Sequence, residues 1–271
     1  MNRSVATLWI GPRLSPLEQL SALSLIETGH DLTLYTYDEV KGVPKGVRVA
    51  DARTLLAGPI VRHKKTGSPA LHSDLFRFEL MRQTESTWVD LDVLAFKPLP
   101  TELDHVFAWE NKCSLNGAIL KLPKTSPALQ ALLAYGDNYK GYPPYLSPQK
   151  KLKYQIKTFW RGMTLPELPW GSIGPIGLTY YLRQSGEIQH ALPRNSFYPV
   201  DQNDTLQLLT DYHLTRQSFT ADVYALHFWV SKMRKLTKTH FAGVIPASSF
   251  MGREIARMEE KFNVDIGLVL T

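Results

Sequence analysis

Short apolar runs and helical patterns alternate along the first part of the chain. Residues 4–11 form an apolar run closed by a Gly-Pro pair, which predicts a buried strand. A helix should begin next, because Ser15 stands at the N-cap position, Pro16 at the first helical position, and Glu18 completes a capping box. Gly29 is a suitable residue to end this helix.

The same alternation continues as far as the middle of the chain. Residues 31–37 predict a second strand, and residues 47–56 predict a short strand that leads into a helix at Asp51. Residues 70–83 have apolar side chains at helical spacing and predict a helix with one buried face. The strand-helix-strand-helix order predicts an α/β protein with a mostly parallel central sheet flanked by helices.

The segment 86–100 places two carboxylates, Asp90 and Asp92, in a short apolar run. Alternate residues of a strand share a face, so we expect both side chains at one place, at the carboxyl end of a buried strand. Two carboxylates there are costly unless a cation or hydrogen-bond donors compensate them. Because Mg²⁺ and Mn²⁺ prefer oxygen ligands, the segment predicts half of a cation site, with a diphosphate as the other half.

The helix expected before this segment carries Asp74 and Arg77, three residues apart. This spacing makes the two side chains neighbours on a helix surface. An exposed ion pair, worth about 0.3–0.5 kcal/mol, is one interpretation of them. A D-x-D pattern alone is common by chance, and its value here comes from the strand and from the Asp-Arg helix that precedes it.

Composition and charge narrow the function only slightly. The 271 residues suffice for one large domain, and the single cysteine, Cys113, excludes an internal disulfide and favours a reducing compartment. The first 20 residues lack the apolar core of a secretory signal, and no apolar run is long enough to span a membrane. The net charge of +6 suits several anionic partners and does not choose among them.

The segment 73–92 resembles the signature of the DXD-containing sugar-binding glycosyltransferases, the clan of outer-chain mannosyltransferases and α-1,4-galactosyltransferases. That signature is S-D-x-x-R, about a dozen residues, an aromatic residue and D-x-D. The matching residues are Ser73, Asp74, Arg77, Trp88, Asp90 and Asp92. The chain departs from the family at residues 84–87, Thr-Glu-Ser-Thr, where the family has a Gly-Gly turn. We therefore expect this turn to be built differently.

Weaker likenesses to the family extend from residue 5 to residue 235. By resemblance, Trp9 would stack on the nucleotide base, Asn116 would face the donor sugar, and Gly174 would let the backbone approach the ligand. The H-x-W motif near the end makes His227 a candidate metal or diphosphate ligand, with Ser231 and Lys232 as donor-binding residues. Three of these residues have a simpler interpretation: Trp9 as a core tryptophan, Asn116 as a polar turn residue and His227 as a structural histidine.

The resemblance implies a GT-A type fold and a retaining, metal-dependent transfer of a hexose from a nucleotide diphosphate sugar, with UDP expected. Mn²⁺ or Mg²⁺ would be held by Asp92, with Asp90 and His227. Asp74 would accept hydrogen bonds from the donor sugar, and Arg77 would place a positive charge near the diphosphate or the sugar hydroxyls. Asp90 would reach the ribose or a metal-bound water. Residues 1–271 would form one catalytic domain, in which 1–125 bind the nucleotide sugar and 126–271 form the acceptor side.

The resemblance also suggests partners and a location. The acceptor would be a glycan or a lipid-linked glycan in polysaccharide biosynthesis, and no nucleic-acid partner is expected. The protein would be cytoplasmic, and basic segments at 139–163 and 231–240 would allow peripheral contact with an anionic membrane face. The segment 139–163 is also a candidate border of the acceptor site. Two alternatives stay open: a metal-dependent phosphohydrolase, and a non-enzymatic basic module that binds polysaccharide.

Overall fold

The computed structural model describes residues 3–136 and 138–270, and it has the α/β architecture that the sequence predicts. Its strands are β1 (Ser4–Trp9), β2 (Asp31–Thr36), β3 (Arg48–Asp51), β4 (Thr87–Val89), β5 (Val93–Ala95), β6 (Val106–Trp109), β7 (Leu115–Lys121) and β8 (Ala225–His227). Its helices are α1 (Pro16–Glu27), α2 (Ala70–Gln83), α3 (Pro127–Leu133), α4 (Pro148–Lys157), α5 (Pro175–Gln184), α6 (Gln207–Thr210), α7 (Val230–Phe241) and α8 (Phe250–Phe262).

The described strands form two sheets. A six-stranded sheet has the order β3-β2-β1-β4-β7-β6, and β5 pairs with β8 in a second, two-stranded sheet. The pairs β1–β2 and β2–β3 are parallel, whereas β6–β7 is antiparallel. The predicted fold class, a mostly parallel central sheet flanked by helices, is confirmed.

The chain divides into two compact units, and neither is continuous in sequence. The unit that contains both ends of the chain, here called the terminal unit, consists of Met1–Asp51, Val89–Leu103 and Leu192–Thr271. The other, here called the central unit, consists of Ala52–Trp88 and Asp104–Ala191. Each unit is described by itself below.

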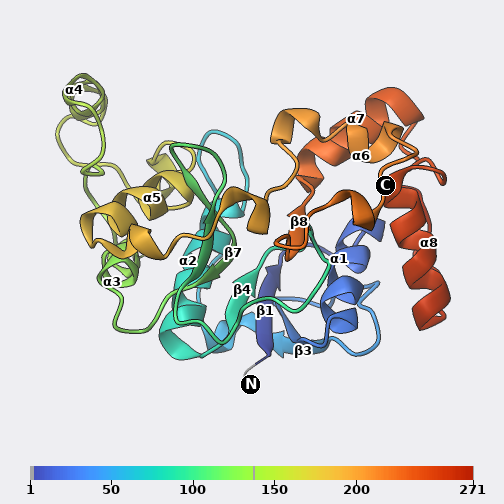
Figure 1. Cartoon of the computed structure of the whole chain (residues 1–271). Coiled ribbons are helices and arrows are strands. Elements are labelled where there is room, and N and C mark those ends of the chain that lie inside the picture. The colour runs from blue at the N-terminus through green and yellow to red at the C-terminus, as the bar shows by residue number, and fades with distance from the viewer. Residues whose placement is uncertain (1–2, 137, 271) are drawn as a thin grey trace. The chain divides into compact units, whose positions relative to one another are not determined.

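In the terminal unit, α1 and α8 pack against each other and enclose a large apolar core (Figure 1). The start of α1 is as predicted: Ser15 and Glu18 form a capping box, and Pro16 is the first helical residue. The α1 helix also holds the second sheet, because the Ser21 hydroxyl donates a hydrogen bond to the Val93 carbonyl (2.7 Å). This bond anchors β5, the strand that follows the two aspartates.

In the central unit, α5 packs on β7 and α3 (Figure 1). The α2 helix spans the range that the sequence predicts, and its apolar residues Leu71, Leu75 and Phe78 are buried. Helix α4 differs from the others because none of its residues is buried.

Two local expectations are wrong. Only a three-residue 3₁₀ turn, Ala52–Thr54, follows β3 where a helix was expected at Asp51. The two aspartates do not lie on one strand: β4 ends at Val89 and β5 begins at Val93, so Asp90 and Asp92 lie in the connection between them.

None of the described helices is both long enough and apolar enough to cross a bilayer.

Candidate functional site

Asp90, Asp92 and His227 come together in the terminal unit, although His227 is far from both aspartates in the sequence. Each offers one ligand atom, and these three atoms lie within 4.8 Å of one another. The antiparallel pairing of β5 with β8 explains the proximity, because it places Val93 opposite His227. The structure thus forms a group that could hold a metal ion, here called the Asp-Asp-His group.

The Asp92 carboxylate is fixed by two contacts. One oxygen lies 3.0 Å from His227 Nε2, and the other accepts a hydrogen bond from the Val230 backbone N–H (3.0 Å). Val230 is the first residue of α7, so Asp92 satisfies one of the backbone donors that the start of a helix leaves without a partner. The positive end of the helix dipole also favours a carboxylate at this place.

The electrostatics of Asp92 favour its charged form. Burial acts to raise its pKa, but the charge and hydrogen bond of His227 and the Val230 N–H outweigh burial, and the pKa of Asp92 is lowered. His227 is buried and Asp92 is mostly buried. The site therefore keeps an ionised carboxylate beside an imidazole, away from bulk water.

These residues fit a divalent cation. The group offers carboxylate oxygens from Asp90 and Asp92 and an imidazole nitrogen from His227, a donor set that suits Mn²⁺ and is compatible with Mg²⁺. Three protein ligands leave further coordination positions for the oxygens of a diphosphate. The predicted metal residues Asp90, Asp92 and His227 are thus brought together.

Trp229, two residues after His227, has an uncommon backbone conformation. Trp229 is in the left-handed region (φ 55°, ψ 63°), which bulky side chains rarely adopt. Its ring lies against that of His227 (4.1 Å between centroids) and near that of Tyr198 (6.3 Å). Strained residues of this kind concentrate at functional sites, where the surrounding structure fixes them. This turn starts α7 where the Asp92 carboxylate can cap it.

The other predicted residues of the terminal unit lie at element ends. Ser231 is exposed and Lys232 half-buried in the first turn of α7. Trp9 is the last residue of β1, and it packs close to Gly11, where an added Cβ would lie 3.1 Å from the indole nitrogen. Among the described residues, the indole N–H groups of Trp9 and Trp229 are buried and have no hydrogen-bond acceptor.

In the central unit, Asp74 and Arg77 lie on α2 as predicted, with 3.5 Å between their charged atoms. They are mostly buried, so the interpretation as an exposed ion pair is wrong. The guanidinium donates a hydrogen bond to the Gly117 carbonyl (2.8 Å) and lies over the Trp88 ring, 4.9 Å from its centroid. Arg77 is therefore held on three sides, by a carboxylate, a carbonyl and an aromatic face.

Two glycines make room for this pair. A Cβ on Gly174, the N-cap of α5, would lie 2.9 Å from an Asp74 carboxylate oxygen, and a Cβ on Gly117 would lie 2.5 Å from Arg77 Nη1. Gly174 therefore admits the Asp74 side chain to the start of a helix. Sequence reasoning missed Gly117, although a glycine inside an apolar strand is a sign of close approach by another group.

The remaining predicted residues of the central unit have ordinary surroundings. Ser73 is half-buried in the first turn of α2, next to Asp74. The Asn116 side chain donates to Glu110 (3.0 Å) and accepts from the Ala118 N–H (2.9 Å), so it stabilises its own hairpin. Their expected donor contacts stay predictions.

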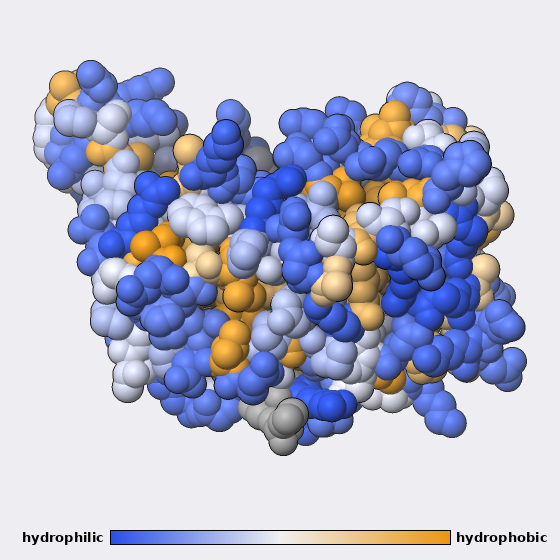
Figure 2. All heavy atoms as spheres, in the orientation of Figure 1, coloured by the Kyte–Doolittle hydropathy of each residue, from blue (hydrophilic) through white to orange (hydrophobic). Residues whose placement is uncertain are grey.

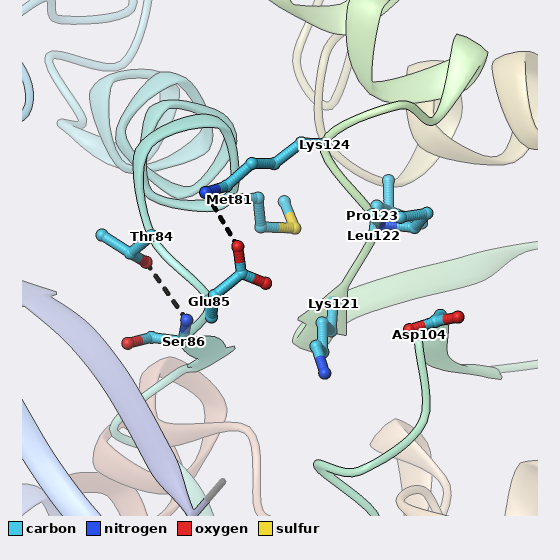
Figure 3. Close-up of a pocket in the computed structure, with 9 residues that line it drawn as sticks. All are labelled: Met81, Thr84, Glu85, Ser86, Asp104, Lys121, Leu122, Pro123 and Lys124. Atoms are coloured by element: carbon cyan, nitrogen blue, oxygen red, sulfur yellow. Dashed lines mark hydrogen bonds and ion pairs between the residues drawn. The ribbon is translucent and has the colours of Figure 1, made fainter.

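Residues 84–86, part of the turn where the sequence departs from the Gly-Gly pattern, line a small pocket of about 140 Å³ (Figure 3). The Thr84 hydroxyl donates to the Leu80 carbonyl (2.9 Å) and accepts from the Ser86 N–H (3.2 Å), which builds the turn without glycine. Lys124 reaches Glu85 across the pocket (2.8 Å). This pocket adjoins the amino end of β4, whereas ligands of open α/β sheets bind at the carboxyl ends of strands.

The comparisons with known proteins add little to this picture. No protein-family model matches the sequence, and no curated protein matches it. A solved structure described as "PaToxG Glycosyltransferase" is similar, with 11% sequence identity, a TM-score of 0.43, and coverage of 97% of this chain and 85% of that chain. A similarity at this level assigns neither a family nor an activity, so the functional conclusion depends on the residues of the site.

Proposed function

We propose that this protein is a glycosyltransferase that moves a hexose from a nucleotide diphosphate sugar, with UDP as the expected nucleotide, to a hydroxyl of a glycan or glycolipid. The observation that carries the proposal is the convergence of Asp90, Asp92 and His227, whose ligand atoms lie within 4.8 Å of one another. The D-x-D signature and the H-x-W motif were identified separately in the sequence, and the family resemblance assigns both to one cation.

The chemistry of the transfer suits this group. Departure of the sugar proceeds through a transition state that resembles an oxocarbenium ion, and negative charge accumulates on the leaving diphosphate. A bound Mn²⁺ or Mg²⁺ would neutralise that charge. Asp92 is oriented before any ligand arrives, because His227 and the Val230 N–H each hold one of its oxygens. Such preorganised groups contribute most where charge develops.

We further propose that the other predicted residues bind the donor. Asp74 would accept hydrogen bonds from the sugar and Arg77 would donate to it, while Trp9 would stack on the base. Ser73, Asn116, Gly174, Ser231 and Lys232 would complete the donor contacts. The reaction would retain the anomeric configuration and use the whole chain as one catalytic domain, in which 1–125 bind the donor and 126–271 form the acceptor side.

A ligand screen tests the proposal. The purified protein would be heated with UDP-, GDP- and CMP-sugars, each with and without Mn²⁺, because a ligand that binds the folded state raises its melting temperature. We expect one nucleotide class to raise Tm in Mn²⁺, and the same donor to release its nucleoside diphosphate when acceptors are added. A glycan library would then identify the acceptor.

The two alternatives give different results in the same screen. A phosphohydrolase would release inorganic phosphate from phosphomonoesters and would not transfer sugar. A binding module would show no metal-dependent shift, and its polysaccharide binding would persist in a chelator. If no nucleotide sugar changes Tm with Mn²⁺ present, the donor assignment is wrong.

A further inference from the structure

Residues 141–163 form an excursion from the central unit with a closed base. Gly141 and Met163 exchange two backbone hydrogen bonds, N–H to carbonyl, of 3.1 and 2.9 Å. Gly162, which directly precedes Met163, has a φ of 83°. A Cβ at this position would lie 2.9 Å from the Gly141 nitrogen. The base is thus a built junction that only glycine allows, and the excursion that it closes, with α4 at its centre, is a defined element.

Helix α4 turns an apolar pair away from the protein. Thr158 is buried and bonds the Tyr142 hydroxyl (2.6 Å), and Tyr154, four residues earlier on the same face, is half-buried. Leu152 and Ile156, also four residues apart, lie on the opposite face and are 52% and 56% exposed. In Figure 1, α4 stands apart from α3 and α5 of the same unit.

Two aromatic residues directly after α4 extend this apolar surface. Phe159 is 89% exposed and Trp160 is 62% exposed. Both have positive φ, 48° and 58°, a conformation that bulky side chains rarely adopt. Consecutive aromatics that are this exposed gain little from packing within the protein. Their placement therefore indicates a role outside the folded chain.

The surroundings of these apolar side chains are uniformly basic. Residues 138–163 contain Lys140, Lys150, Lys151, Lys153, Lys157 and Arg161 and have no aspartate or glutamate. Arg161 is already paired with Glu167 (2.7 Å). Figure 2 shows the result at α4, where hydrophilic residues surround a few hydrophobic ones.

We propose that Leu152, Ile156, Phe159 and Trp160, with the lysines of α4, are a docking surface for an anionic lipid bilayer. Aromatic rings favour the boundary between headgroups and acyl chains, and lysines are attracted to anionic headgroups. An amphipathic helix with this composition binds in the plane of a membrane interface. A protein partner fits less well, because lysine is depleted in protein–protein interfaces. The inference does not depend on the proposed transferase activity.

Sedimentation with lipid vesicles tests the docking surface without any donor or acceptor. The full chain is mixed with two kinds of vesicle. One is phosphatidylcholine with about 30% phosphatidylserine, which carries roughly the charge of an anionic membrane face, and the other is phosphatidylcholine alone. We expect binding to the anionic vesicles only, weakened by salt. The double variant Phe159→Asn/Trp160→Asn should reduce the partition coefficient by about tenfold or more, because the aromatic anchors are lost. Because asparagine tolerates positive φ, the Tm of the double variant should not fall below that of the wild type.

Matched variants separate this surface from general attraction of a basic protein. Lys153→Gln/Lys157→Gln should weaken binding several-fold, whereas Lys235→Gln/Lys238→Gln, which removes the same charge from exposed positions of α7, should change it less than twofold. Tyr212→Asn, at another exposed aromatic residue, should bind as the wild type does. The proposal would be overturned if both lysine pairs lost binding equally, or if the aromatic double variant bound as the wild type does. It would also be overturned if the wild type did not bind anionic vesicles, a result that would favour a protein partner.

Discussion

The Asp-Asp-His group and the Asp74–Arg77 pair are both mostly buried and charged, but they balance their charge differently. The pair contains its own counter-charge, since the Arg77 guanidinium lies 3.5 Å from the Asp74 carboxylate. The group places two carboxylates around one imidazole, so an added cation completes it. The difference fits the roles proposed for them: the group could hold a metal ion, and the pair would present fixed polar atoms to the donor.

The two clusters also differ in what holds them. Asp92 is fixed by a backbone N–H at the start of α7 and by His227, across a pairing of two short strands. Arg77 is fixed by a carbonyl and an aromatic face that it reaches only because Gly117 has no side chain. The group should therefore tolerate an isosteric change of charge without unfolding, whereas the pair should be sensitive to small changes of volume.

The largest loss of turnover is expected from Asp92→Asn. Asparagine keeps an oxygen that accepts from the Val230 N–H, but it removes a charged ligand, so metal-dependent transfer should fall by about 10³-fold or more. The protein should stay folded, with a lower Tm because the charged contact with His227 is lost. Steady-state kinetics, a Mn²⁺ titration by calorimetry and thermal unfolding would measure the three quantities.

Asp204→Asn is the control, because it makes the same substitution at an exposed position of the same unit. It should leave all three quantities unchanged. Full turnover and unchanged Mn²⁺ affinity in Asp92→Asn would remove the metal from the interpretation of this group.

Arg77→Ala should have the second largest effect. It removes a positive group in a mostly buried site and leaves Asp74 without it, so kcat/KM should fall by about 10²–10³-fold, and stability should fall by about 3 kcal/mol. Arg82→Ala is a matched control, because Arg82 pairs with Glu79 at the same spacing on the same helix (2.6 Å) but is exposed. It should cost less than about 1 kcal/mol and no activity. Similar kinetics for the two variants would mean that Arg77 has a structural role only.

Gly117→Ala should have a smaller effect that reaches Arg77 indirectly. The added methyl group would lie 2.5 Å from Arg77 Nη1 and must displace the guanidinium, at a cost of about 1–3 kcal/mol in stability and about tenfold in kcat/KM. Gly136→Ala in the same unit meets no atom within 4 Å and should be neutral. If Gly117→Ala matches Gly136→Ala in unfolding and kinetics, the close packing of Arg77 has no consequence.

Much of the fold and part of the site were predictable from sequence because their causes are local. Hydrophobic periodicity and the capping box at Ser15 identified α1, and the apolar face of 70–83 identified α2. The position of Asp90 and Asp92 was predicted only approximately, because β4 ends at Val89 and β5 begins at Val93, and the connection that holds both aspartates leaves no local signal in the sequence. The D-x-D pattern itself was still informative, because both residues contribute to the Asp-Asp-His group.

The parts that sequence missed depend on contacts between distant segments. Nothing local in the sequence indicates that Asp92 caps α7 by accepting from the Val230 N–H, or that Trp229 has positive φ, because both follow from the way β8 enters α7 beside β5. The approach of Arg77 to Gly117 likewise joins α2 to β7. The meeting of His227 with the aspartates was predicted through family resemblance, which carries long-range information that periodicity lacks.

A third charged cluster, around Glu27, is expected to contribute to stability alone, unlike the Asp-Asp-His group and the Asp74–Arg77 pair. Glu27 on α1 lies 2.5 Å from Arg257 and 2.8 Å from Lys261, both on α8. Burial acts to raise its pKa, but hydrogen bonds from these two residues outweigh it and lower the pKa to about 2. Glu27→Gln should therefore lower the free energy of unfolding by about 1–3 kcal/mol at neutral pH and leave kcat/KM unchanged.

The pH dependence of this difference identifies its cause. Because the folded-state pKa of Glu27 lies below its ordinary value of 4.5, its contribution is complete above that value and is lost as the pH falls toward 2. Denaturant unfolding of the wild type and Glu27→Gln should thus converge between about pH 5 and pH 2, while Glu39→Gln, at an exposed position, should match the wild type throughout. A stability gap that persists at pH 2 would assign the effect to packing, and a loss of turnover at neutral pH would show that α8 contributes to the site as well as to stability.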